Sequence, residues 1–220
     1  MPFLELLISL LAPHHCLGCQ AEGALLCRKC SLRLQHLPER CYRCRKLSTG
    51  GRTCKACRRT SKLYAVLVGL SYEGLVKDTI WQFKFHSGHA ADKPLARLML
   101  TRLQQSYDMV VPVPTATLRT RQRGYDQAVL LARELGSLTG FPVVNVLHRS
   151  GQAHQVGASR RQRLEQLKRA FWTHSGVDLT NKHILLVDDV VTTGATLEAA
   201  AEALKAAGAA KVSAVVVAQA

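Results

Sequence analysis

The stretch from residue 184 to 196 constrains the fold more than any other part of this chain. Four apolar residues at 184–187 lead into Asp188 and Asp189, and a Thr/Gly turn then runs into an Ala/Leu/Glu-rich segment. This order predicts a buried strand, a loop and the first turn of a helix. Ligands of open parallel sheets bind just outside the carboxyl ends of the strands, so the two acids are expected beside a ligand.

The turn at residues 192–196 suits a phosphate group. It brings backbone N–H groups, hydroxyls and a helix N-terminus around one point. Carboxylates beside a phosphate would repel it, so Asp188 and Asp189 are predicted to face sugar hydroxyls or a Mg²⁺ ion. Ribose 5-phosphate offers both groups at a suitable separation. The alternative is an ordinary strand–turn–helix in which an Asp caps the helix, but a cap needs only one acid.

The same stretch resembles the phosphoribosyl pyrophosphate (PRPP) motif of type I phosphoribosyltransferases. That motif places two acids after an apolar strand, then two apolar residues, then a Thr-Gly-rich loop, and this chain keeps the order. The resemblance implies a site for PRPP or ribose 5-phosphate, with magnesium accompanying PRPP. The residues predicted to bind it here are Asp188, Asp189, Thr192, Thr193, Gly194, Ala195 and Thr196.

All eight cysteines fall in four Cys-x-x-Cys pairs within the first 57 residues of the chain. Two such pairs complete one tetrahedral Cys₄ zinc site, so two structural zinc ions are predicted, with one zinc and a degenerate second site as an alternative. Sequential pairing closes short loops, whereas interleaved pairing closes longer ones at more entropic cost. Disulfides need an oxidising compartment, and the N-terminus lacks the basic region of an export signal. The predicted ligands are Cys16, Cys19, Cys27, Cys30, Cys41, Cys44, Cys54 and Cys57.

The positive charge of the chain points to an anionic partner. Thirty Lys and Arg against fifteen Asp and Glu give a net charge of +15. Twelve of the basic residues lie between Cys27 and Lys62, where Glu39 is the sole acid. Such a concentration is typical of a nucleic-acid surface, although a solvated basic face has the same composition. The predicted nucleic-acid contacts are Arg43, Arg45, Arg58 and Arg59, and single strands are favoured if Tyr42 or Tyr64 stacks on bases.

Three further basic stretches are predicted to contribute to the site. The first follows the strand end at 111–114 and carries Arg119, Arg121 and Arg123, whose guanidinium groups suit a diphosphate. The second begins at Arg149, and the third places Lys84 at the end of an apolar helix. A solvated basic face is the alternative for each. Trp81 and Trp172 are predicted to be core residues.

Hydrophobic periodicity beyond residue 62 alternates between strands and helices. Strands are predicted at 65–72, 109–113, 142–147, 184–188 and 211–218, and helices at 75–85, 90–105, 125–138 and 196–207. A short apolar helix is predicted at 1–11, and a basic helix or partly ordered segment at 159–170. Alternation of this kind predicts an α/β fold with a parallel sheet flanked by helices. The predicted domains are residues 1–62, an N-terminal helix with a double zinc ribbon, and residues 63–220, the phosphoribosyltransferase-like domain.

Together these segments resemble the ComF/GntX family over nearly the whole chain. The shared features are the Val-Pro-Val-Pro strand end, the Arg-Gly-Tyr-Asp-Gln-Ala segment, the Ser-Arg-x-x-Arg loop and the PRPP motif. Asp126 stands where the family usually has Asn, which puts a negative charge near the predicted diphosphate. The resemblance implies a cytoplasmic protein that handles single-stranded DNA in natural transformation or in the use of DNA as a nutrient. Proteins of the DNA-uptake machinery are the implied partners.

Catalysis is an open question at this point. If the chain transfers a pentosyl group, diphosphate leaves a ribosyl oxocarbenium ion, and the protein stabilises the departing charge. Purine-salvage members of the superfamily carry an acid in the loop where this chain has Thr192, so no proton acceptor and no catalytic residue are evident. Three classes stay open: a transferase for an unknown nucleobase-type acceptor, a single-stranded DNA binding protein with PRPP as ligand, and a PRPP-sensing regulator. The apolar run 6–12 is too short to span a bilayer, so no stable membrane insertion is expected.

Overall fold

The computed structural model describes residues 14–85, 88–116, 120, 122–150, 166–167, 169–173 and 176–220. Several predictions lie outside these residues: the helix at 1–11, the diphosphate contacts Arg119 and Arg121, and most of the basic helix at 159–170. Within the described ranges, no helix has both the length and the apolar character needed to cross a membrane.

A four-stranded parallel sheet forms the centre of the fold, with the strand order β1-β6-β5-β2. The strands are β1 (Ala65–Ser71), β2 (Met109–Pro112), β5 (His183–Val191) and β6 (Lys211–Gln219). Residues 184–187 of β5 and 214–218 of β6 are fully buried. Both faces of these inner strands are covered, which explains why their sequences are continuous apolar runs rather than alternating patterns. The predicted α/β class is confirmed.

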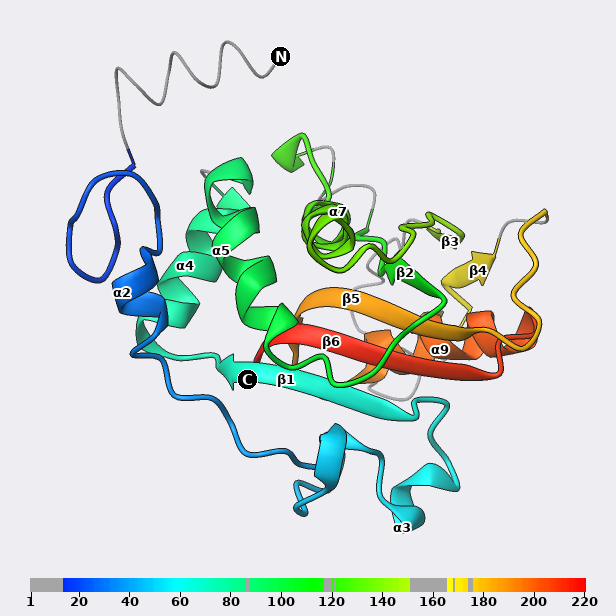
Figure 1. Cartoon of the computed structure of the whole chain (residues 1–220). Coiled ribbons are helices and arrows are strands. Elements are labelled where there is room, and N and C mark those ends of the chain that lie inside the picture. The colour runs from blue at the N-terminus through cyan, green and yellow to red at the C-terminus, as the bar shows by residue number, and fades with distance from the viewer. Residues whose placement is uncertain are drawn as a thin grey trace.

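Two layers cover the sheet (Figure 1). Helices α4 (Gly74–Phe85), α5 (Gly88–Leu100) and α7 (Gln127–Thr139) pack on one face. Helix α9 (Ala195–Ala206) and the antiparallel pair of β3 (Leu147–Arg149) and β4 (Phe171–Thr173) pack on the other. Neighbouring residues of β5 therefore enter different clusters: Leu185 packs with the first layer and Leu186 with the second.

The cysteine-rich segment contacts both layers. It contains α2 (Arg28–Ser31), the 3₁₀ turn η1 (Thr49–Gly51) and α3 (Lys55–Arg58). Cys16, Leu26 and Cys30 pack in the cluster of α4 and α5, whereas Tyr42 packs in the cluster of α9. Between these two contacts the chain passes beneath β1, as Figure 1 shows. The boundary between residues 62 and 63 stays a prediction.

Three predicted elements differ from the structure. The strand predicted at 142–147 was wrong. Val143 makes a single bridge to Val110 of β2. The chain forms a strand only from Leu147 onward, where β3 pairs with β4. The helix expected at 90–105 ends at Leu100, since the amides of Arg102 and Leu103 bond back three residues in tight turns. Strand β5 extends past the predicted end at 188, so both acids lie inside it.

Candidate functional site

The eight cysteines form two separate clusters, each built from consecutive Cys-x-x-Cys pairs. Within each cluster the four sulfur atoms lie within 4.8 Å of one another. Tetrahedral zinc with Zn–S bonds of about 2.3 Å places its sulfurs about 3.8 Å apart. The Cys19–Cys27 and Cys44–Cys54 sulfur pairs are each separated by 3.6 Å. The sequential arrangement is therefore the one observed, and both clusters have the geometry to hold zinc. The members are Cys16, Cys19, Cys27 and Cys30, and Cys41, Cys44, Cys54 and Cys57.

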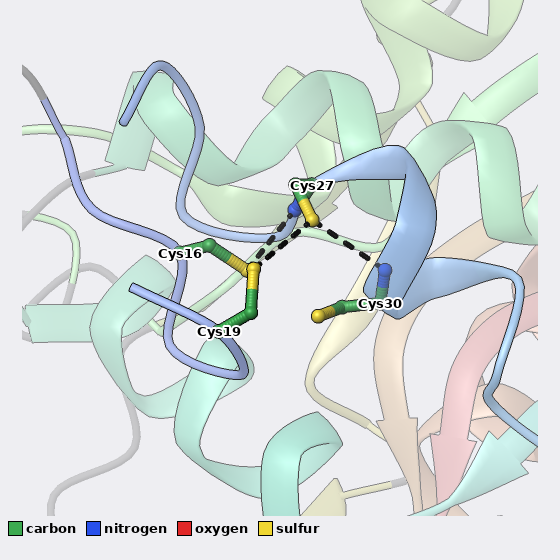
Figure 2. A group of neighbouring side chains, drawn as sticks. All are labelled: Cys16, Cys19, Cys27 and Cys30. Carbon is green, nitrogen blue, oxygen red and sulfur yellow. Dashed lines mark hydrogen bonds between the residues drawn. The ribbon is translucent and has the colours of Figure 1, made fainter. Parts of the chain in front are cut away.

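Figure 2 shows how the first cluster is assembled from a loop and a helix start. Cys16 and Cys19 come from the loop, and Cys27 caps α2 by accepting the amide of Cys30 at 3.4 Å. Burial opposes ionisation of Cys16, yet amide donors, with Cys27 first, lower the pKa of its thiol to about 6. Burial, followed by the sulfur of Cys19, raises the pKa of Cys30 to about 12. Four crowded thiols thus ionise together only beside a cation, which zinc supplies when bound.

A pocket of about 330 Å³ lies at the carboxyl end of β5 and contains the predicted acids. The predicted residues that line it are Asp188, Asp189, Thr192, Thr196 and Arg123. Thr193, Gly194 and Ala195 lie in the same loop without lining the cavity. The volume falls in the ordinary range of small-ligand sites.

The two acids differ in their partners. Lys84 Nζ of α4 lies 2.7 Å from Asp189 Oδ2, in an ion pair that joins α4 to β5. Asp188 Oδ1 accepts the amide of Asp189 at 2.8 Å. Burial, followed by the charge of Asp189, raises the pKa of Asp188 to about 8. Lys84 already pairs with Asp189. A divalent ion beside Asp188 would lower this raised pKa and favour the ionised carboxylate that binds a metal.

Three cations line the same pocket: Lys84, Arg123 and Arg149. They come from the three basic stretches identified in the sequence, which the fold brings together. Arg123 Nη1 donates to Gln127 Oε1 at 3.0 Å. Gln127 is only 2% exposed, and its Nε2 has no hydrogen-bond partner among the described residues. A buried donor left over in a cationic pocket fits an oxygen-rich ligand. Sequence patterns gave no signal for Gln127 beyond its place in the family segment.

The second cysteine cluster packs against the loop between β5 and α9 through Tyr42. Gly194 has φ of +79°, and a Cβ there would lie 2.5 Å from the ring of Tyr42. Tyr42 stands between Cys41 and Cys44, and its hydroxyl donates to the Glu198 carboxylate of α9. The other Glu198 oxygen accepts the amide of Lys62 at 2.9 Å. The predicted zinc ribbon thus contacts the predicted phosphate loop directly.

Comparison with known proteins decides the family. The model of the phosphoribosyl transferase domain matches residues 86–220. Competence protein F of Haemophilus influenzae is 30% identical over 206 residues, which cover 88% of this chain and 85% of that protein. The chain belongs to the ComF family. DNA utilization protein YhgH of Escherichia coli K12 is 29% identical, covering 92% of the ComF-family chain and 96% of its own length.

The chain is also partly similar to a solved structure. The glutamine PRPP amidotransferase of Bacillus subtilis is 22% identical to the ComF-family chain, with a TM-score of 0.43. That similarity covers 58% of this chain and 26% of the other.

The contact between Tyr42 and Gly194 gives the ComF-family protein a testable steric constraint. Gly140 has nearly the same backbone, with φ of +77°, but nothing lies within 4 Å of the position that a Cβ would take there. We expect Gly140→Ala to cost about 1 kcal/mol through the left-handed backbone alone. Gly194→Ala should cost roughly 1–3 kcal/mol more, because its methyl group collides with the Tyr42 ring. Urea denaturation measures both losses, and equal losses would contradict the steric role of Tyr42.

Asp126 of the ComF-family chain has a structural position. Its carboxylate caps α7 through the amide of Ala128 at 3.0 Å, and it accepts the amide and the hydroxyl of Thr115 at 2.8 and 3.1 Å. These three donors direct the charge toward the start of α7 and the loop after β2. Asp126 does not line the pocket.

Two sequence predictions about aromatic residues were wrong. Tyr42 is 3% exposed and covered by Gly194, so it cannot stack on bases. Trp81 and Trp172, predicted as core, are each 48% exposed. Trp81 packs against the exposed Phe85, and Trp172 stacks on His148 across the β3–β4 pair. Burial of Trp residues cannot be read from their size alone, since both lie on the outward faces of their elements.

Proposed function

We propose that this ComF-family chain binds PRPP or ribose 5-phosphate with magnesium, and that it handles single-stranded DNA in natural transformation or in the use of DNA as a nutrient. One observation carries the first part. Asp188 and Asp189 share a single cavity of about 330 Å³ with Lys84, Arg123 and Arg149. Acids suited to hydroxyls or a divalent ion thus lie beside cations suited to a diphosphate.

Each part of the ligand has a matching wall of the pocket. The 5-phosphate suits residues 192–196, where α9 begins and its first amides face the loop. The ribose hydroxyls suit Asp188 and Asp189. Arg123 and the spare Nε2 of Gln127 suit the diphosphate, and Arg119, outside the described residues, is proposed to join them. Magnesium, when bound, neutralises diphosphate charge, and Asp188 is the acid most suited to it.

Binding without transfer is the form of the function that the site favours. Thr192 lines the pocket at the loop position where purine-salvage relatives carry an acid. The hydroxyl of Thr192 does not accept a proton from a nucleobase at neutral pH. The described lining contains no other acid than the pair expected to serve ribose and magnesium. Pentosyl transfer would therefore need a proton acceptor from the substrate or from a partner.

The proposed role in DNA handling rests on the charge of the chain and on the names of its relatives. Proteins named competence protein F and DNA utilization protein align over most of this chain. The predicted contacts Arg43, Arg45, Arg58 and Arg59 are all exposed. We propose that this work takes place in the cytoplasm beside the DNA-uptake machinery, with two structural zinc ions holding the ribbon.

One titration tests the proposal. PRPP is added to the protein with and without magnesium, and with and without a single-stranded oligonucleotide, while heat, diphosphate release and oligonucleotide anisotropy are recorded. We expect magnesium-dependent PRPP binding, oligonucleotide binding and no diphosphate release. Absence of PRPP binding would overturn the site, and steady diphosphate release would replace the binding function with an active transferase.

A further inference from the structure

A line of three cavities runs along the outer edge of β1, outside the pocket of Asp188. Their volumes are about 370, 100 and 300 Å³. The first and second share Leu67 as a wall, and the second and third share Tyr64. The cysteine-rich segment passes beneath β1 along this edge (Figure 1). We call the three cavities together the β1 groove.

The β1 groove is strongly cationic. Its acidic member, Glu39, is already engaged by the amide of Gly50 at 2.6 Å, by Gln104 Nε2 at 2.7 Å and by Arg102 at 3.7 Å. Eight basic residues face this single acid, and they come from the ribbon, the turn after α5, α9 and β6. The basic residues lining the groove are Arg40, Arg45, Arg52, Arg58, Lys62, Arg102, Lys205 and Lys211.

Three of these cations converge on one aromatic ring. Lys211 Nζ lies 4.7 Å from the centroid of Tyr64, and the guanidinium carbons of Arg58 and Arg52 lie at 5.4 and 5.8 Å. No carboxylate of the described residues lies within salt-bridge distance of the three. Like charges gathered in this way repel one another, and a bound anion would relieve the repulsion.

Unused hydrogen-bond donors mark the other end of the groove. Gln219 is 8% exposed and lines the first cavity, and its Nε2 has no partner among the described residues. Arg102 Nε, in the same cavity, is likewise buried without a described acceptor. Both ends of the groove therefore offer donors and positive charge, as a chain of phosphates requires.

We infer that the β1 groove seats the phosphate backbone of a single-stranded nucleic acid. The inference rests on the proposed DNA-handling function and gives it a location. The three cavities follow β1 one after another. A flexible single strand can bend its backbone into each of them in turn, whereas a duplex is stiff over this length. The face of Tyr64 is covered by cations and Tyr107 is 5% exposed, so the groove contacts backbone rather than bases. Binding is therefore independent of base sequence.

The groove divides the predicted DNA contacts into two groups. Arg45 and Arg58 line it, whereas Arg43 and Arg59 do not. Arg43 Nη1 instead donates to Thr60 Oγ1 at 2.7 Å. Exposed cations of the same ribbon that lie outside the groove provide a control of equal charge.

The test compares two triple variants that each remove three positive charges. The groove variant carries Arg52→Gln, Arg58→Gln and Lys211→Gln. The control variant carries Arg43→Gln, Lys55→Gln and Arg59→Gln. We expect the groove variant to lose at least about tenfold in affinity for a short single-stranded oligonucleotide. The slope of its log K against log salt should become shallower by about 2, since each lost phosphate contact changes this slope by roughly 0.7. The control variant should stay within a few-fold of the parent, and both should keep parental zinc content and PRPP affinity.

The possible failures are distinguishable. Failure of the parent to bind the oligonucleotide would overturn the proposed DNA function together with the groove. Parental affinity in the groove variant, or equal weakening in both variants, would overturn the groove alone. Equal binding of a duplex with the same sequence would overturn the assignment to single strands.

Discussion

Replacing Asp188 and Asp189 together with Asn is expected to reduce the affinity for PRPP with magnesium by at least about a hundredfold, or about 2.7 kcal/mol. The two acids line the pocket at the end of β5, where they suit ribose hydroxyls and a divalent ion. Asn keeps the shape of each side chain and removes the charge. Isothermal calorimetry with PRPP and magnesium measures the effect, and parental affinity in the double variant would show that the site lies elsewhere.

Inorganic diphosphate without magnesium is the control ligand for this variant. Lys84, Arg123 and Arg149 remain in the pocket when the acids are neutralised, and Lys84 is released from its 2.7 Å ion pair. The variant should therefore bind diphosphate at least as tightly as the parent. A parallel loss of diphosphate binding would mean that the pocket had collapsed rather than lost its sugar and metal contacts.

The single change Asp188→Asn also has an expected effect on stability. Burial, followed by the charge of Asp189, raises the pKa of Asp188 to about 8 in the fold, against about 3.9 in an unfolded chain. Between about pH 3.9 and pH 8 the unfolded state binds fewer protons at this carboxyl than the folded state does. The contribution of Asp188 to the free energy of unfolding therefore falls as the pH rises through this range. Without magnesium, the melting temperature of the Asp188→Asn variant should therefore depend less on pH between about 4 and 8 than that of the parent.

Loss of one zinc ligand is expected to act differently in the two cysteine clusters. Cys19 and Cys44 are matched, since both are exposed ligand positions in Cys-x-x-Cys pairs. Either change to Ser should lower zinc content from two ions toward one per chain. Cys44→Ser should also weaken PRPP binding by at least about tenfold, or about 1.4 kcal/mol, because Tyr42 then no longer supports Gly194 and α9. Cys19→Ser should leave PRPP affinity within a few-fold of the parent.

Tyr42→Phe separates the effect of the Tyr42–Glu198 hydrogen bond from the effect of zinc loss. It keeps the ring against Gly194 and removes the hydroxyl that donates to Glu198. Zinc content should stay at two, measured by elemental analysis, while PRPP affinity falls several-fold. Equal PRPP losses in Cys19→Ser and Cys44→Ser, with none in Tyr42→Phe, would contradict the link between the second cluster and the phosphate loop.

The sequence predicted the parts of the molecule that depend on local patterns. Apolar runs at 184–187 and 214–218 located the inner strands, and the Cys-x-x-Cys spacing located both clusters. The weak strand β4, with three residues, has no comparable signal and was missed. Trp81 was misplaced because α4 buries Val76, Ile80 and Phe83, and Trp81 lies off that stripe.

The assembly of the site was only partly predictable. The sequence named Lys84, Arg123 and Arg149 in separate stretches, but only tertiary packing brings them to one cavity. The role of Tyr42 had no signal, because a residue between two zinc ligands can face either solvent or the core. The β1 groove likewise combines residues from four elements far apart in the sequence.

The two cysteine clusters pack on opposite layers of the sheet, with Cys16 in one hydrophobic cluster and Tyr42 in the other. Zinc scarcity would therefore not inactivate the protein in a single step. Chains holding one ion would form two populations, and those loaded at the second cluster would keep a supported phosphate loop. Under the proposed function, ligand binding would then follow the affinity of that one cluster for zinc, and the supply of a trace metal would set the fraction of molecules able to bind PRPP.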